Sequence, residues 1–240
     1  MTSAVSAHGT VLIWNYCKLL EMVSIGGLSQ SRDTIDVTSH DSPDQFREYI
    51  AGLGDGGEVS LEGNLLTTDI LGQIALHTDM QAGSVKPTFL LLPMSIGQAM
   101  SFNAIPTKFE PSFPHDGKSS VSMSLKVTGK PTLLTTQSAG MTGLTGIEQT
   151  GSAALTITPA IAVGTYEYAC TVNTASTWVK LTVTAAGHTI YVNGVAQTSG
   201  TEGNQIALGA AGTDTVIHIL VYESNKAPRL YKLTVHRLEE

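Results

Sequence analysis

The side chains that could bind a metal or act as a nucleophile are scattered along this chain. Histidines stand singly at positions 8, 40, 77, 115, 188, 218 and 236, and none has the short spacing to another histidine or cysteine that forms a zinc site. Cys17 and Cys170 lie in no nucleophile motif, and no nucleophile-elbow, phosphate-binding or dinucleotide-binding pattern occurs. We therefore expect two reduced, buried thiols, no metal site and no cofactor.

A dense group of acids is the second feature that could do chemistry. Residues 31–62 hold eight acids and two bases, so they account for −6 of the chain's net charge of −7. The acids are Asp33, Asp36, Asp41, Asp44, Glu48, Asp55, Glu58 and Glu62. Glycan hydrolysis needs a carboxylate pair on a rigid cleft, whereas Asp41 to Gly57 begins and ends in turn-forming sequence and is expected to be a flexible polar loop. The chain is therefore predicted not to be an enzyme.

The overall charge also excludes several classes of partner. The chain has 20 acids against 13 bases, which is the reverse of a surface that neutralises nucleic-acid phosphates. Its apolar runs are far shorter than the roughly 20 residues that span a bilayer, and its first residues lack the pattern of a signal peptide. We expect a protein that is made in the cytoplasm, does not enter a membrane and does not bind DNA tightly.

Strands must position most of these residues. Only 14% of the chain is charged and glycine is frequent, with 24 copies, a composition that favours strands joined by tight turns. One helix is predicted, capped by Thr67 or Thr68, with Asp69 in its first turn and Gly83 beyond its end. Its apolar face would comprise Ile70, Leu71, Ile74 and Ala75. The strands expected in the first half are Lys18 to Ser24, Thr34 to Thr38, Glu58 to Asn64, Lys86 to Leu92, Met100 to Phe109 and Ser119 to Thr128.

The length of 240 residues favours two domains. We expect a first domain over residues 1–135, a Gly/Thr/Ser-rich linker over 136–151 and a second domain over 152–240. The second domain is strand and turn throughout, and Asn193-Gly194 is the dipeptide that type I′ hairpins prefer. An immunoglobulin-like sandwich with Trp178 in its core is the leading expectation. The predicted fold class is therefore mainly β.

An ordered series of short motifs resembles the tail tube proteins of long-tailed, non-contractile bacteriophages. The resemblance covers about residues 3–135. The motifs are Ile25 to Gly27, Asp36 to Ser42, Arg47 to Leu53, Asp55 to Val59, Leu61 to Asn64 and Leu125 to Pro131. The part from Thr165 onward resembles the cadherin-like or bacterial immunoglobulin-like domains that decorate tail tubes. The first domain is thus expected to be a tail tube β-sandwich with one helix that forms a barrel on assembly.

The resemblance implies a structural virion protein whose hexameric rings stack into the tail tube, assembled in the host bacterial cytoplasm. Its partners would be further copies of itself, the tape measure, tail tip and tail terminator proteins, DNA that passes without specific binding and, for the second domain, weakly bound cell-surface glycans. A long loop in such proteins bridges adjacent rings. The candidate residues for this loop are Asp41, Asp44, Phe46, Arg47, Glu48, Tyr49 and Asp55.

The acids suggest how such a tube would pass DNA. We expect Asp33, Asp36, Glu58 and Glu62 to help line the bore and repel the like-charged duplex. Glu58 and Glu62 share a strand face, and Val59, Leu61 and Leu65 take the opposite one. The alternative is an adhesin, in which the first domain anchors an immunoglobulin-like domain that binds a cell surface.

Overall fold

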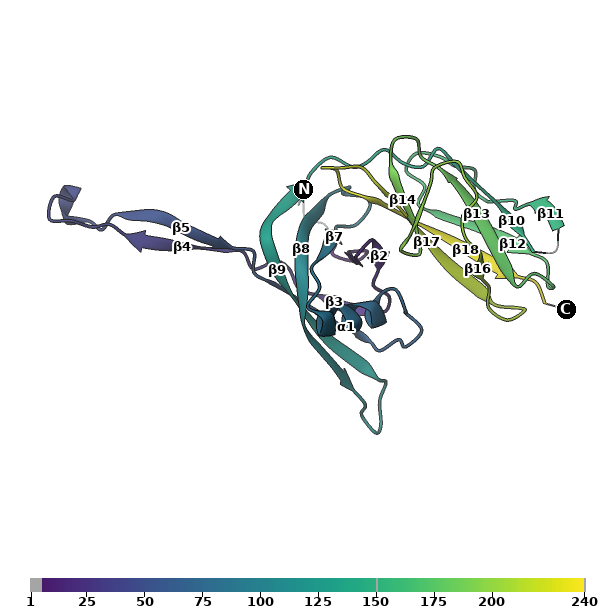
Figure 1. Cartoon of the computed structure of the whole chain (residues 1–240), viewed down its shortest axis with the longest axis horizontal. Coiled ribbons are helices and arrows are strands. Elements are labelled where there is room, and N and C mark those ends of the chain that lie inside the picture. The colour runs from purple at the N-terminus through teal and green to yellow at the C-terminus, as the bar shows by residue number, and fades with distance from the viewer. Residues whose placement is uncertain (1–5, 150, 240) are drawn as a thin grey trace. The chain divides into compact units, whose positions relative to one another are not determined.

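The computed structural model describes residues 6–149 and 151–239, and it consists of two compact units. Unit 1 comprises Met1–Lys18, Leu90–Met100 and Leu133–Glu240, and unit 2 comprises Leu19–Phe89 and Ser101–Thr132. Strands dominate both units, and the described residues contain a single α-helix (Figure 1). The predicted fold class, mainly β with one helix, is confirmed. The predicted domain boundaries at residues 135 and 152 stay a prediction.

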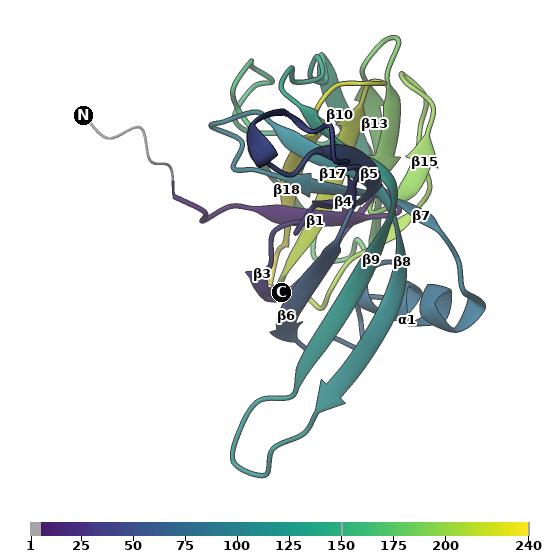
Figure 2. The ribbon, with the colours of Figure 1, turned by 90° about the vertical axis from the view of Figure 1, so that its left-hand side faces the viewer.

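The largest sheet has seven strands in the order β2-β1-β7-β8-β9-β6-β3. Figure 2 shows β8 and β9 as its longest members, side by side along much of their length. The strands are β1 (Val11–Trp14), β2 (Cys17–Lys18), β3 (Met22–Ile25), β6 (Glu58–Asn64), β7 (Lys86–Leu91), β8 (Ala99–Ser112) and β9 (Ser120–Leu134). β6 has the bounds that alternation predicts, whereas the single strand expected over Lys18 to Ser24 is interrupted at Glu21, whose φ is 57°.

A separate ribbon projects from unit 2 and is formed by β4 (Ser31–Asp36) and β5 (Tyr49–Asp55) (Figure 1). The two strands pair antiparallel, with a register shift between Arg32 and Thr34. The expectation of an irregular loop from Asp41 to Gly57 is therefore wrong for its second half, which is strand. Both faces of the ribbon are exposed, so its sequence lacks the alternation that marks a half-buried strand.

Helix α1 (Gln73–Ala82) ends as predicted but begins later. Gly83 closes it with a left-handed φ of 63°. Asp69 Oδ2 accepts hydrogen bonds from the backbone N–H groups of Leu20 and Gln73, which holds the segment before the helix in turns. The predicted caps at Thr67 and Thr68 are thus wrong, and so is the predicted apolar face, because Ile70 is 68% exposed while Gln73 and Leu76 are buried.

The second half of the chain forms two further sheets, in unit 1. One has the order β11-β10-β13-β16 and the other β12-β18-β17-β14-β15. Their strands are β10 (Gly143–Glu148), β11 (Gly151–Ala154), β12 (Glu167–Val172), β13 (Trp178–Thr184), β14 (Thr189–Val192), β15 (Val195–Gln197), β16 (Ile206–Ala207), β17 (Asp214–Tyr222) and β18 (Arg229–Arg237). Their buried side chains form one core, and Asn193-Gly194 makes the predicted hairpin turn, with φ values of 47° and 81°.

Two expectations about this sandwich are wrong. Trp178 is half-buried on the outer side of β13, with Lys180 Nζ 5.6 Å from its ring centroid, because the alternation points Val179 and Leu181 inward instead. Residues 143–148, expected within the linker, form β10 and pair with β13 along its length. Gly146 is small for a packing reason, since a Cβ there would lie 2.8 Å from Leu155 Cδ1. Glycine there serves close packing and not flexibility.

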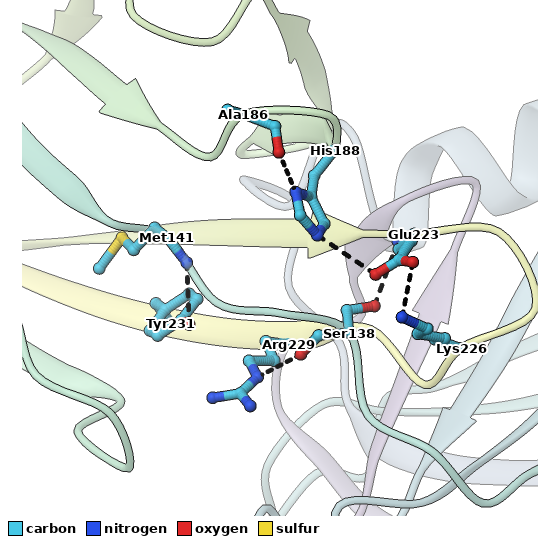
Figure 3. A network of polar contacts seen from close by, with 8 residues as sticks. All are labelled: Ser138, Met141, Ala186, His188, Glu223, Lys226, Arg229 and Tyr231. Carbon is cyan, nitrogen blue, oxygen red and sulfur yellow. Dashed lines mark hydrogen bonds and ion pairs between the residues drawn. The ribbon is translucent and has the colours of Figure 1, made fainter.

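A polar network fixes the chain where it enters this sandwich (Figure 3). Ser138 is fully buried; its carbonyl accepts a hydrogen bond from Arg229 Nε at 2.6 Å, and its hydroxyl accepts one from the Glu223 backbone N–H at 3.1 Å. The Glu223 carboxylate lies 2.6 Å from Lys226 Nζ and 3.3 Å from His188 Nε2. These contacts tie the segment before β10 to the ends of β17 and β18.

Candidate functional site

The strands of the large sheet that belong to unit 2 have one polar face. Along β6 the exposed Glu58, Ser60 and Glu62 alternate with the buried Val59 and Leu61, so the predicted division of this strand into an acid face and an apolar face is confirmed. The neighbouring β9 alternates in the same way, with Val121, Met123 and Leu125 buried. We call the outward set the polar face: Ser24, Glu58, Ser60, Glu62, Ser120, Ser122, Ser124 and Lys126.

Strand pairing sets the charge of the polar face. Directly opposite partners are Glu58 with Lys126, Ser60 with Ser124, and Glu62 with Ser122. Ser24 of β3 lies opposite Glu62 on the other side. Lys126 is the one cation of this set, and its ammonium group contacts both oxygens of Asp55, at 2.7 and 2.8 Å. Apart from this paired lysine, the polar face consists of serine hydroxyl groups and the carboxylates of Glu58 and Glu62, which make the surface hydrophilic and weakly acidic.

The second candidate surface is the ribbon of residues 31–55, which we call the arm. It exposes large apolar side chains to solvent: Phe46 is 75% exposed and Leu53 is 84% exposed. Ile35, Tyr49 and Ile50 are each about half exposed. Adjacent exposed apolar groups are typical of a surface that another protein covers. In residues 6–149 and 151–239, which the structure describes, no further strand pairs with the outer edges of β4 and β5.

Hydrogen bonds between side chains and backbone shape residues 37–48, which we call the tip. Ser42 Oγ accepts a hydrogen bond from the backbone N–H of Ser39 and donates to Glu48 Oε2 at 2.8 Å. Thr38 Oγ1 accepts from the Glu48 backbone N–H at 3.0 Å. Arg47 lies 3.7 Å from the carboxylate of Asp36. The tip therefore has a defined turn structure, held by its own polar residues.

Hydrogen bonds lower the pKa of two arm carboxyls. Bonds from the Thr38 side chain and backbone hold the pKa of Asp36 below its ordinary value. The hydrogen bond from Lys126, followed by one from the Gly57 backbone N–H, does the same for the pKa of Asp55. Both carboxyls therefore become protonated at a lower pH than they would without these hydrogen bonds.

The structure divides the predicted site residues between these two surfaces. It places Glu58 and Glu62 on the polar face, and it places Asp33 and Asp36 on β4 of the arm. Of the predicted loop residues, Asp41, Asp44, Phe46, Arg47 and Glu48 lie in the tip and Tyr49 and Asp55 in β5. Their roles in a channel or between rings stay predictions.

Sequence reasoning missed the contribution of β9 to the polar face. The alternation of serine with Val121, Met123 and Leu125 is visible in the sequence, but by itself it predicts only which side chains are buried. The outward serines become informative once β9 is known to pair with β6, since pairing puts both polar rows on one surface.

Cys17 and Cys170 form no disulfide, and burial raises the pKa of the Cys170 thiol to about 11. Cys17 is only half-buried, so the expectation of two buried thiols holds for Cys170 alone. Among the residues that the structure describes, no cluster of three metal-binding side chains occurs. In the same part of the chain, no helix has the length and apolar character needed to cross a bilayer.

Two family models match the chain. Residues 23–133 match the phage tail tube protein family, and residues 152–238 match the cadherin-like beta sandwich domain. Both resemblances stated from the sequence motifs are thereby confirmed.

Several solved structures are similar in part. A chain from the virion of a native gene transfer agent particle is 17% identical, with a TM-score of 0.47, over 54% of this chain and 98% of that chain. A chain from the sheath/tube terminator of an extracellular contractile injection system is 15% identical, with a TM-score of 0.46, over 55% of this chain and 98% of that chain. A chain from the anti-feeding prophage baseplate is 12% identical, with a TM-score of 0.46, over 56% of this chain and 97% of that chain. None of the curated proteins matches the sequence.

Proposed function

Since this chain carries a phage tail tube protein domain followed by a cadherin-like domain, we propose that its copies close into hexameric rings and stack into a tube whose acidic channel passes DNA during ejection. The family places the chain in the virion, as a structural protein of the tail. The two-sided sheet of unit 2 is the observation that carries the proposal. One side is packed with apolar groups and the other is the polar face.

Ring closure would satisfy an exposed sheet edge. β3 is the outermost strand next to β6, and its Val23 is 68% exposed. An unpaired edge strand presents free N–H and C=O groups that pair readily with another chain. In a closed barrel each subunit pairs its edge with its neighbour, so that no edge remains. The polar faces of all subunits then meet around the bore.

The chemistry of the polar face suits passage without adhesion. Duplex DNA carries one negative charge per roughly 1.7 Å of its axis. Glu58 and Glu62 repel it, and screening at physiological salt confines this repulsion to about 8 Å. The serine hydroxyls between them hold water and offer no cation to the phosphates. DNA would slide past such a wall without binding it.

The arm would connect one ring to the next. Its exposed Phe46, Tyr49 and Leu53 would be covered there by another copy. Tape measure, tail tip and tail terminator proteins would fill or end the tube, after assembly in the bacterial cytoplasm. The role of the chain is thus structural, and we propose no catalytic activity for it.

Electron microscopy of the concentrated protein tests the assembly. Rings and tubes are expected, and a strict monomer under all conditions, including with tail tip components, would contradict the proposal.

The channel is tested with phage that carry Glu58→Lys together with Glu62→Lys. These changes are expected to leave the tube intact and slow DNA ejection, because lysines would hold the phosphates. The control is Glu167→Lys with Glu202→Lys, an equal charge change on exposed acids of the sandwich. Unchanged ejection in the Glu58/Glu62 variant would rule out this face as the channel wall.

A second candidate role is weak attachment to cell-surface glycans, and a groove in the sandwich favours it. The groove has a volume of about 810 Å³, and His236 Nδ1 lies 2.7 Å from Asp214 Oδ1 at its wall. Its further polar lining comprises Glu148, Thr156, Thr158, Thr171 and Thr234. Glycan-array binding by the full chain that is lost in Asp214→Ala would support this role, and absence of binding would remove it.

A further inference from the structure

We propose that the tip of one copy docks into a groove at the root of the arm of a second copy. The inference rests on the proposed function, and it names the surface that receives the arm. The groove, which we call the root groove, has a volume of about 910 Å³. It is lined by Gln30, Ser31, Arg32, Gly54, Asp55, Gly56, Val127, Thr128, Gly129, Lys130 and Pro131.

The root groove is basic. Arg32 lies along β5, where its Nη1 donates a hydrogen bond to the Gly52 carbonyl at 3.3 Å. Lys130 adds a second cation, and the one acid of the lining, Asp55, is already paired with Lys126. Two cations therefore face the groove without an opposing charge from its walls.

The tip is acidic and carries an aromatic anchor. Together with Asp36 it holds four acids and one arginine, a net charge of −3. The acids are Asp36, Asp41, Asp44 and Glu48. Within the described part of the chain, no hydrogen bond or ion pair engages the carboxylates of Asp41 and Asp44. Phe46 follows Asp44 by two residues and is 75% exposed. Aromatic side chains often anchor protein interfaces. The negative charge of the tip is opposite to the positive charge of the root groove.

Geometry makes the contact intermolecular. The tip is separated from its own root by the paired strands of the arm (Figure 1). β4 has six residues, which span roughly 20 Å at the rise of a β-strand. The tip cannot fold back into its own groove while these strands are paired. Each copy therefore offers a tip to one neighbour and a groove to another, and such a head-to-tail contact extends without limit unless it closes.

The tip is also suited to binding because its shape exists before contact. The bonds of Ser42 to Glu48 and of Thr38 to Glu48 fix the turn that presents Phe46. A preformed loop loses less conformational entropy on docking than a disordered one. On the other side, Gly54 and Gly129 line the root groove, are exposed and have no side chain that would block the tip.

Disulfide formation between two variants tests the contact. Phe46→Cys and Thr128→Cys are mixed under mild oxidation, and a cross-linked dimer is expected. The control acceptor is Ser119→Cys, which is also exposed but lies before β9, at the opposite end of that strand from the groove. Phe46→Cys should not link to it. A link to Ser119→Cys, or none to Thr128→Cys in a sample that forms tubes, would overturn the docking site.

Charge reversal provides a second test, read by electron microscopy. Asp41→Lys with Asp44→Lys, and separately Arg32→Glu with Lys130→Glu, should each abolish tubes and leave single rings. Combining all four changes should restore tubes. Tubes in either double variant would refute the docking while the proposed function stands, whereas a wild-type chain that forms neither rings nor tubes would refute the proposed function itself. Circular dichroism of each variant verifies that it is folded.

Discussion

Lys126 donates hydrogen bonds to both carboxylate oxygens of Asp55, at 2.8 and 2.7 Å, and this contact joins β9 to the root of the arm. Lys126 also lies directly opposite Glu58 of β6, so this ion pair stands beside the polar face. The same residue thus affects both candidate surfaces. It connects β9 to the arm, and its charge is balanced by Asp55.

We expect Lys126→Met to loosen the arm without unfolding unit 2. The ion pair is exposed, with side chains 44% and 52% accessible, and exposed pairs contribute little to stability. The thermal midpoint should barely change, while limited proteolysis within residues 31–55 becomes faster and tubes form less readily. Lys108→Met is the control, since Lys108 pairs with Glu110 far along the sequence from the arm. Equal proteolysis of the two variants would contradict this role of Lys126.

Gln73 should be among the most sensitive polar positions of unit 2. Its buried side chain accepts a hydrogen bond from the Leu66 N–H and donates to the carbonyls of Leu20 and Asn64. Gln73→Ala leaves these groups unsatisfied and is expected to lower the free energy of unfolding by roughly 2–4 kcal/mol. On the same helix, Gln81→Ala removes only a contact with His77 and should change stability by less than about 0.5 kcal/mol. Urea unfolding of both variants measures the difference, and similar midpoints would disprove it.

Gly146→Ala should destabilise the sandwich. The added methyl would lie 2.8 Å from both the Lys180 carbonyl oxygen and Leu155 Cδ1, and overpacking of this kind costs roughly 1–3 kcal/mol. Gly27→Ala serves as control, because no atom lies within 4 Å of a Cβ at that position. Thermal unfolding should separate the two variants. If Gly146→Ala were neutral, residues 143–148 would not be packed as β10.

The stability of unit 1 should fall as the pH is lowered from about 6.5 to about 4, and His218 is the reason. Burial, followed by the charges of Lys18 and Lys232, lowers the pKa of His218 from 6.5 to about 4. Lys18 Nζ lies 3.4 Å from His218 Nε2. Lys232 of β18 lies directly opposite His218, and the Glu167 carboxylate lies 3.9 Å from Lys232 Nζ. In this window the unfolded chain binds the proton and the folded chain does not, so folding is fully favoured only above pH 6.5.

The free energy of unfolding is expected to fall by roughly 3 kcal/mol between these pH values. This figure follows from a pKa difference of about 2.5 between the unfolded and the folded chain, at about 1.36 kcal/mol per pKa unit. Urea unfolding at pH 4 and pH 7 measures it. His218→Gln should reduce the pH dependence by that amount, whereas His115→Gln, at an exposed loop position, should leave it unchanged. If the wild-type chain and His218→Gln had the same pH profile, His218 would not be the group responsible.

The sequence by itself determined the features that depend on neighbouring residues. Alternation predicted β6 with its observed bounds and the division of Glu58 and Glu62 from Val59 and Leu61. Asn193-Gly194 and Gly83 were predictable because turns and helix ends need positive φ, which these residues adopt at little cost. The motifs for the tail tube and cadherin-like domains were likewise readable from the chain alone.

Only the tertiary structure decided what depends on distant partners. The helix begins at Gln73 because Asp69 bonds to Leu20, 49 residues away. Gly146 marks close packing and not a linker, and that is visible only with β13 and Leu155 beside it. The polar face arises from pairing β6 with β9, and Lys126 meets Asp55 across 71 residues. Local patterns set the face of a strand, but hydrogen bonding between strands decides which faces combine into a surface.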